Sequence, residues 1–318
     1  MSDQGVPARL FELARRAQAP DALSDHGLRA RFGDPADAVI QVGQVWRARW
    51  DDVSVLLLIL ATEARDVLAA PVSIDPPAED ERCIVIDASS TAFAVEATVW
   101  ADMAGSVPVR VLERAVDQWN ETIADWILQR SGSGGDLPQG VRPGRPISDE
   151  FGPSALVRAE IADDLDALVR APGLPAATPG EQRQDLASLL RGKLDLAALC
   201  AALDLPQPKV IRIVRGKEPL TTDQMAVVAS ITGLTTEQVA QSVRPLPLGL
   251  VVKAEHPRWR PAWQQRARTY GITEAQARLT ASYGAYALAA RETRGGEPDW
   301  DQRLREFLRD ETKPAGES

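Results

Sequence analysis

The sequence of 318 residues predicts a multidomain α+β protein, with a small β-barrel first and helices after it. Two observations predict this fold class. Between residues 39 and 109, apolar residues alternate with polar ones or form short apolar runs, as strands do. After residue 181, apolar residues recur at three- and four-residue spacing, as in amphipathic helices. The expected regions are a barrel with flanking helices (1–130), a linker with one helix (131–180), a helical domain (181–243) and a C-terminal helical region (244–318).

Five short segments predict the strands of the barrel. The first two are separated by Asp51 and Asp52, which are turn residues. The second segment is apolar throughout, so we expect it to be buried on both faces. Strands at this spacing are typical of a small barrel. The predicted strands are 39–50, 53–61, 66–74, 82–87 and 93–100.

Helices and linkers are expected around these strands. Residues 7–18 predict a short amphipathic helix, and 107–129 predict a strand that leads into a helix. A Gly/Pro/Ser-rich segment at 131–146 predicts a flexible linker, and a helix is expected at 153–170. One helical stripe is expected to hold Val111, Leu112, Ala115, Val116, Trp119, Ile123, Trp126 and Ile127.

Residues 195–217 predict two short helices joined by a tight turn. Asp195 is placed to cap the first helix, which runs to about Leu203. Asp204 follows, where the turn needs a residue that tolerates positive φ. The second helix is expected to begin near Pro206 or Pro208 and to end at Gly216. Two further helices are expected to begin at capping boxes, formed by Thr221 with Gln224 and by Thr235 with Gln238.

The second of these helices carries basic residues on its polar side. Residues 207–217 contain four cations and no anion, and the cations lie opposite Val210, Ile213 and Val214. A short helix with projecting cations fits the major groove of DNA, where it meets phosphates and guanine edges. The residues predicted to bind double-stranded DNA are Gln207, Lys209, Arg212, Arg215 and Lys217.

This stretch resembles the Xre family of bacterial and phage repressor-type domains. The family consensus, roughly L-A-x-x-L-G-V-S-x-x-x-I-S-R-I-E-R-G, is in register with residues 199–216. The resemblance implies a helix–turn–helix domain over 181–243, a homodimer on an inverted repeat, and repression or autoregulation of an operon, including toxin–antitoxin and phage-defence operons. Cys200, Asp204 and Leu196 depart from the Ala, Gly and Gln of the family, and the last departure removes a phosphate contact.

The predicted barrel resembles, over residues 39–128, the PemK/MazF-type toxins, which are SH3-like barrels that cleave RNA. The resemblance rests on Gly43-Gln-Val-Trp46, the apolar strand 53–61 and Ala70-Pro-Val-Ser73. Their catalytic pair is an Arg before the second strand and a Thr or Ser after the third-strand Pro. Ser73 fits the second position, but no Arg-Pro precedes Val53. RNA cleavage needs a cation that stabilises the phosphorane charge, and only Arg47 or Arg49 of the neighbouring strand could replace the missing Arg. We therefore expect no catalytic site.

Composition excludes several other classes of function. The net charge of −9 excludes a non-specific nucleic-acid coat, which needs a large positive surface. Cys83 and Cys200 lie in apolar runs and indicate no disulfide framework. His26 and His256 are far apart in the sequence, so no metal site is expected. No glycine-rich loop follows a strand in the way that binding a cofactor's phosphate groups requires, so no cofactor is expected. No membrane span or signal peptide is expected, which favours a cytoplasmic protein.

Five arginines and three aromatic residues are interleaved in 256–278. Such a pattern stacks bases in some proteins, but Arg stems also cover Trp and Tyr rings in ordinary helix packing. We favour packing for Trp259, Trp263 and Tyr270.

The sequence therefore predicts a DNA-binding regulator whose barrel senses a ligand or binds a protein partner. One alternative is a PemK/MazF-like endoribonuclease fused to a DNA-binding domain. Another is a non-enzymatic adaptor that uses both modules for protein contacts.

Overall fold

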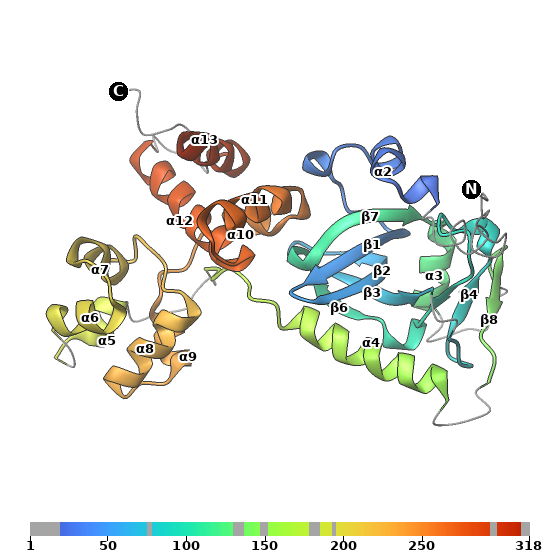
Figure 1. The fold of residues 1–318 in the computed structure, drawn as a ribbon, viewed down its shortest axis with the longest axis horizontal. Helices are drawn as coiled ribbons and strands as arrows, with labels where there is room; N and C mark the ends of the chain where they lie inside the picture. Colours follow the sequence, from blue (N-terminus) through green and yellow to red (C-terminus); the bar gives the residue numbers. More distant parts are fainter. Residues whose placement is uncertain are drawn as a thin grey trace, which may run out of the picture. The chain divides into compact units, whose positions relative to one another are not determined.

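The computed structural model describes residues 20–74, 78–129, 137–146, 152–177, 185–192, 195–292 and 298–312. The chain divides into two compact units, residues 1–171 and 172–318. Unit 1 contains an antiparallel sheet with helices, and unit 2 is helical (Figure 1). The predicted mixed α+β class is therefore confirmed. The helix expected at 7–18 lies outside the described residues.

Among the residues that the structure describes, the sheet of unit 1 has eight strands, which pair in the order β7-β1-β2-β3-β5-β4-β8, while β6 pairs with β3. The path has two ends, and within the described ranges no pairing joins β7 to β8. The sheet is thus not closed into the barrel that we expected. The strands are β1 (Gln44–Trp50), β2 (Val53–Thr62), β3 (Asp66–Ser73), β4 (Ile84–Ile86), β5 (Ala97–Val99), β6 (Gly105–Pro108), β7 (Leu112–Gln118) and β8 (Val141–Pro143).

Helices cover both faces of the sheet, so its apolar side chains are buried although the sheet is open. Leu58 of β2 is fully buried in a cluster that includes Ile123 of α3 (Glu121–Gln129). Its neighbour Leu57 belongs to a second cluster with Leu168 of α4 (Pro153–Val169), the helix along one face of the sheet in Figure 1. Helices thus cover the apolar side chains of both faces without closure. The predictions of a doubly buried second strand and of a helix at 153–170 are confirmed.

The prediction of a helical stripe from Val111 onward is wrong. Residues 112–118 form β7, which pairs with β1, and α3 begins only at Glu121. The pairing of β1 with β7 contains two register shifts. Each shift adds a residue to one strand, so the apolar pattern departs from the two-residue period of a regular strand. The apolar residues of 111–118 therefore happened to fit helical spacing. These residues form a strand because they pair with β1.

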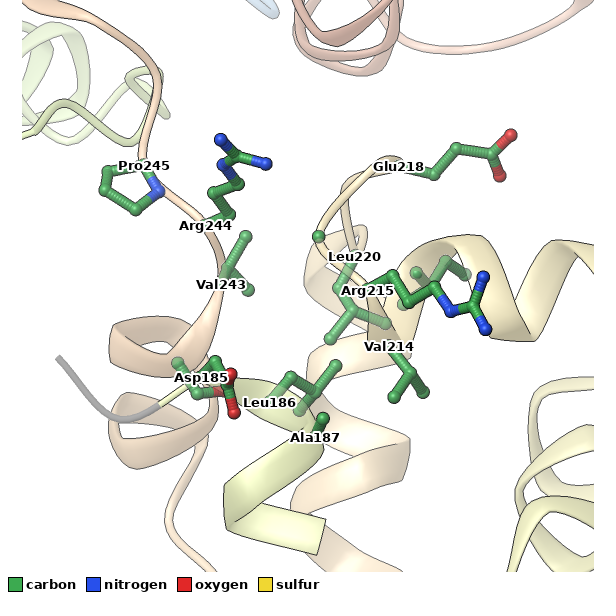
Figure 2. A pocket seen from close by; sticks show the side chains of 13 residues that line it. Asp185, Leu186, Ala187, Val214, Arg215, Glu218, Leu220, Val243, Arg244 and Pro245 are labelled. Carbon is green, nitrogen blue, oxygen red and sulfur yellow. The ribbon is translucent and has the colours of Figure 1, made fainter. Parts of the chain in front are cut away.

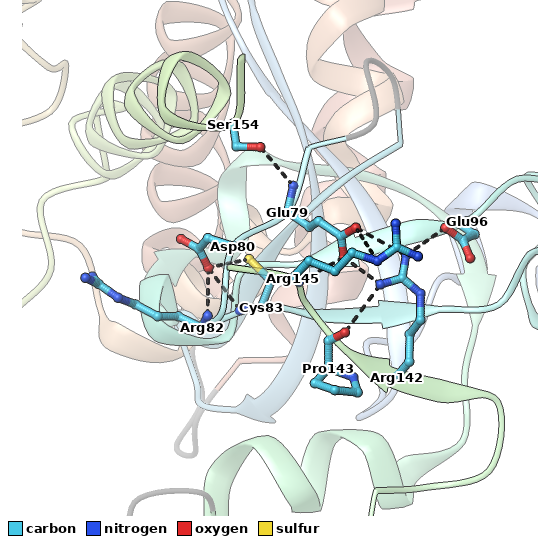
Figure 3. Close-up of polar contacts among 9 residues, drawn as sticks. All are labelled: Glu79, Asp80, Arg82, Cys83, Glu96, Arg142, Pro143, Arg145 and Ser154. Atoms are coloured by element: carbon cyan, nitrogen blue, oxygen red, sulfur yellow. Dashed lines mark hydrogen bonds and ion pairs between the residues drawn. The ribbon is translucent and has the colours of Figure 1, made fainter. Parts of the chain in front are cut away.

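Part of the expected linker 131–146 belongs to the sheet, because Val141–Pro143 form β8 on the edge of β4. Figure 3 shows how this segment is held: Arg142 donates hydrogen bonds to Glu79 at 2.6 Å and to Glu96 at 2.9 Å. Burial alone would raise the pKa of Glu79, but the hydrogen bond and charge of Arg142, together with those of Arg145, lower the pKa below its ordinary value. The prediction of a flexible linker is therefore wrong for these residues, because strand pairing and the hydrogen bonds of Arg142 hold them to distant parts of the chain.

In the described part of unit 2 there are two hydrophobic clusters, one among the helices between residues 186 and 242 and one among those between residues 248 and 312. The helices are α5 (Leu186–Leu190), α6 (Leu196–Leu203), α7 (Gln207–Val214), α8 (Thr222–Thr232), α9 (Thr236–Ser242), α10 (Leu248–Glu255), α11 (Arg260–Tyr270), α12 (Glu274–Glu292) and α13 (Trp300–Thr312). A further helix, α2 (Asp25–Phe32), belongs to unit 1. None of the described helices has the length and apolar character that crossing a membrane requires.

The segment 256–278 packs as an ordinary helical surface. Trp263 is buried and stacks on Trp259 with ring centroids 6.0 Å apart. Arg260 is buried with them and pairs with Glu274 at 3.2 Å. Since these rings are enclosed, they are not available to stack bases, and the packing interpretation is confirmed for both tryptophans. Tyr270 is half exposed and lies under Arg266.

Candidate nucleic-acid interface

The pair of helices α6 and α7 forms as the sequence predicts. The Asp195 carboxylate accepts a hydrogen bond from the Ala198 N–H at 2.7 Å and so caps α6. Asp204 has φ 49° and ψ 46°, the left-handed conformation expected of the turn. Pro206 precedes α7, and Pro208 lies in its first turn, where the missing N–H has no helical partner to lose. Local sequence therefore determines the start, the turn and the second start.

The apolar side of α7 attaches it to the rest of the helical unit. Val210 and Ile213 are buried in a cluster with Leu199 of α6, Val228 of α8 and Val239 of α9. Helices α8 and α9 both begin with complete capping boxes, as predicted. The position of α7 is thus fixed by side chains from three neighbouring helices.

All five residues predicted to bind DNA are exposed. They are Gln207, Lys209, Arg212, Arg215 and Lys217. Arg212 lies three residues from both Lys209 and Arg215, so the three exposed cations follow one another along the surface of α7. Arg212 and Arg215 point away from the buried Val210 and Ile213. Lys209, Arg215 and Lys217 form no ion pair with any residue that the structure describes. Their charges are therefore available to a ligand.

Gly216 ends α7 in the conformation that the sequence suggested. Its φ is +65°, and the Lys217 N–H turns back to the Arg212 carbonyl at 2.8 Å. A Cβ at this position would lie only 2.8 Å from the Cβ of Arg244, which follows α9. Glycine is thus needed twice here, for the backbone and for the close approach of a second segment.

The sequence reasoning missed one contact of this face. Arg212, the central cation, forms an ion pair with Glu218, which lies beyond the turn at Gly216. The count of cations over 207–217 stopped one residue short of this anion. The signal in the sequence was a Glu two residues after the predicted C-cap glycine, where the chain reverses toward the helix. Arg212 therefore has an intramolecular competitor for any phosphate or base.

A cavity of about 520 Å³ lies beside the C-terminal end of α7 (Figure 2). Its walls are mainly apolar, with Leu186 of α5, Leu220 and Val243 among them, and the charged ends of Arg215 and Arg244 lie at its margin. The stem of Arg215 thus covers apolar surface while its guanidinium remains in solvent.

The residues of the alternative ribonuclease site are not brought together. Arg47 pairs with Leu56, and Leu56 pairs with Val72, so these three side chains share one face of the sheet. Ser73 follows Val72 and lies on the opposite face. There its hydroxyl accepts a hydrogen bond from the Trp100 indole at 3.0 Å. Arg47 itself pairs with Glu113.

Cysteine and metal chemistry receive no support from the geometry. Cys83 is buried, and burial raises the pKa of its thiol, which donates to the Asp80 carboxylate at 3.1 Å. Cys200 is half-buried in α6. Within the part of the chain that the structure describes, no three His, Cys, Asp or Glu side chains are grouped as a metal site requires.

Comparisons with protein-family models and with curated proteins found no match to the chain.

Proposed function

We propose that residues 181–243 are a helix–turn–helix domain of the Xre type, which binds a specific site on double-stranded DNA through α7. The protein is then a transcriptional regulator, a repressor or an autoregulator. The single observation that carries the proposal is the division of α7 into a buried apolar side and an exposed side with Lys209, Arg212 and Arg215.

The geometry around α7 supports this proposal over a purely structural helix. A recognition helix must be held firmly from behind and must project side chains that reach base edges. The buried Val210 and Ile213 provide the first condition. The exposed Gln207 and the three cations provide the second, because Arg and Lys donate to guanine and Gln pairs with adenine.

The charge balance supports a specific and dimeric mode of binding. Residues 181–243 contain seven basic and seven acidic side chains, so the domain as a whole attracts DNA only weakly. One copy of α7 offers few contacts. Two copies on an inverted repeat double them, and the spacing between the half-sites then adds specificity.

The test is selection of duplexes from a random pool with the full chain, followed by fluorescence anisotropy of the recovered sequence and of a scrambled duplex. We expect the selected duplex to bind at least about 10³-fold more tightly at physiological salt. Equal affinity for both duplexes would overturn the proposal and favour an adaptor that uses the same cations to bind proteins.

The alternative of a ribonuclease is disfavoured by the sheet geometry. Ser73 and Arg47 lie on opposite faces and are both engaged in other contacts. A base or nucleophile and a cation must meet at one phosphate to stabilise its transition state, which this arrangement prevents.

A further inference from the structure

Besides the cavity beside α7 in unit 2, a cavity of about 600 Å³ lies in unit 1, and the proposed DNA-binding function does not use it. It lies between the segment that follows α2 and strands β1 and β7. Phe32 and Ala38 contribute to its apolar lining, and Gln44 and Trp46 of β1 reach it from the sheet. Both of these β1 side chains are more than nine-tenths buried, at 6% and 1% exposed.

The amide of Gln44 is held in one orientation. Its Oε1 accepts hydrogen bonds from the Gln41 N–H at 2.9 Å and from the Trp46 indole N–H at 2.8 Å. Since both of these groups are donors, the oxygen must face them, and Nε2 occupies the other side of the amide. This Nε2 donates to no acceptor among the described residues. This donor opens to the cavity, where a ligand can accept its hydrogen bond.

Gln118 provides the complementary group. It is the cross-strand partner of Gln44 in the pairing of β1 with β7, and it lines the same cavity. Its Nε2 donates to the carbonyls of Val42 at 3.3 Å and Trp119 at 3.0 Å. With its donors committed, Gln118 offers Oε1, which accepts no hydrogen bond from any described residue. Gly43 permits this arrangement, because a Cβ there would lie 2.9 Å from the Gln118 Nε2.

The charges around the cavity restrict the ligand further. Its lining includes two cations, Arg31 and Arg114, and four anions: Asp34, Asp37, Glu113 and Glu121. Both arginines are already paired, Arg31 with Asp117 and Arg114 with Asp25. An anionic ligand would meet net negative charge and no available guanidinium, so an anion is disfavoured.

We infer that this cavity binds an uncharged planar heterocycle with a lactam edge, a carbonyl oxygen beside a ring N–H, as in uracil and hypoxanthine. The carbonyl accepts from Gln44 Nε2, and the ring N–H donates to Gln118 Oε1. Phe32 contributes an apolar wall. The site is in unit 1 and does not depend on DNA binding by α7, so either proposal can fail alone.

The first test uses the unmodified full chain and isothermal titration calorimetry. Uridine and inosine should bind with a Kd below about 1 mM. Cytidine and N3-methyluridine, which lack the ring N–H beside the carbonyl, should bind at least about tenfold more weakly. Uridine monophosphate should also bind more weakly than uridine. Absence of uridine and inosine binding, or equal binding of N3-methyluridine, would overturn the inference.

The second test uses two variants that add the same charge to the cavity. Gln44→Glu keeps an oxygen for Gln41 and Trp46 but removes the free donor. Gln41→Glu adds the charge at an exposed lining residue and leaves the donor in place. We expect uridine affinity to fall at least about tenfold in Gln44→Glu and no more than about twofold in Gln41→Glu. Equal losses in two folded variants would contradict the assigned role of Gln44. Circular dichroism checks the fold, and the discrimination of N3-methyluridine by the wild-type chain stands if Gln44→Glu does not fold.

Discussion

Strand β2 and helix α7 are both rich in aliphatic residues, but their second sides differ. Leu57 and Leu58 of β2 face opposite sides of the sheet, and both are buried. In α7 the buried Val210 and Ile213 lie opposite exposed cations. Both faces of β2 are therefore covered by the fold, whereas one side of α7 is charged and exposed. A charged face that folding does not use is where function is most reasonably sought.

The comparison predicts its largest effect in β2. Leu58→Ala should lower the free energy of unfolding of unit 1 by about 2–5 kcal/mol, because it removes buried apolar surface and leaves a cavity. The measurement is urea denaturation followed by circular dichroism. The matched control is Leu156→Ala in α4, a leucine that is 69% exposed and should change stability by less than about 0.5 kcal/mol. Similar losses in both variants would contradict the two-sided burial of β2.

The next effect concerns the end of α7. Gly216→Ala and Gly233→Ala both place a Cβ at positive φ, +65° and +69°, but only the first meets another segment. We expect about 1 kcal/mol of destabilisation from the backbone at each position, and about 1–2 kcal/mol more at Gly216 from the contact with Arg244. Thermal unfolding of the two variants measures the difference. An equal loss would mean that Arg244 moves aside freely.

A third effect concerns pH and the other helical cluster of unit 2. Burial, with Arg258 and Lys253 nearby and only partly opposed by Asp301, lowers the pKa of His256 from 6.5 to about 4. Below pH 6.5 the unfolded chain binds a proton that the folded chain does not. Stability should therefore fall as pH decreases from 6.5 to 4, by about 1–2 kcal/mol after allowing for partial exposure.

His256→Asn isolates this effect. Asn can still accept the hydrogen bond that the Arg258 N–H donates to the His256 ring at 3.3 Å, but it does not titrate. Calorimetry of the two proteins from pH 7 to 4 should show a shallower loss of thermal stability in the variant. Parallel curves would show that His256 is protonated equally in both states.

The smallest effect concerns the ion pair on the exposed face of α7. Glu218→Gln releases Arg212, and we expect affinity for the selected duplex to rise about two- to fivefold at low salt. Stability should change by less than about 0.5 kcal/mol. Glu237→Gln in α9 is the matched control, because it makes the same change in net charge at an exposed glutamate of the same domain. A similar gain in both variants would attribute the effect to net charge alone.

The sequence predicted best where structure is determined locally. Asp195, Asp204 and the two capping boxes act within a few residues, and each forms as expected. The apolar run of β2 was equally informative, since a strand with no polar side must be covered on both faces.

The sequence predicted the structure poorly where a residue distant along the chain determines the local conformation or contact. Residues 112–118 became a strand because β1 lies beside them, and Arg142 is held by Glu79, which is far away in sequence. The ion pair between Arg212 and Glu218 depends on a chain reversal at Gly216. The amides of Gln44 and Gln118 meet only through strand pairing. The contacts between strands and the pair of Arg142 with Glu79 have no local signature, whereas Glu218 after the predicted C-cap glycine was a local signal.

The most direct test of the account is the affinity of Arg212→Ala for the selected duplex, measured by anisotropy over a series of salt concentrations. The matched control is Arg268→Ala, an exposed arginine of α11 that lies outside the proposed domain. We predict that Arg212→Ala weakens specific binding by about 1–3 kcal/mol. Arg268→Ala should leave binding within about 0.5 kcal/mol of wild type. Unchanged binding by a folded Arg212→Ala protein, or equal losses in the two variants, would contradict the assignment of α7 as the DNA-reading helix.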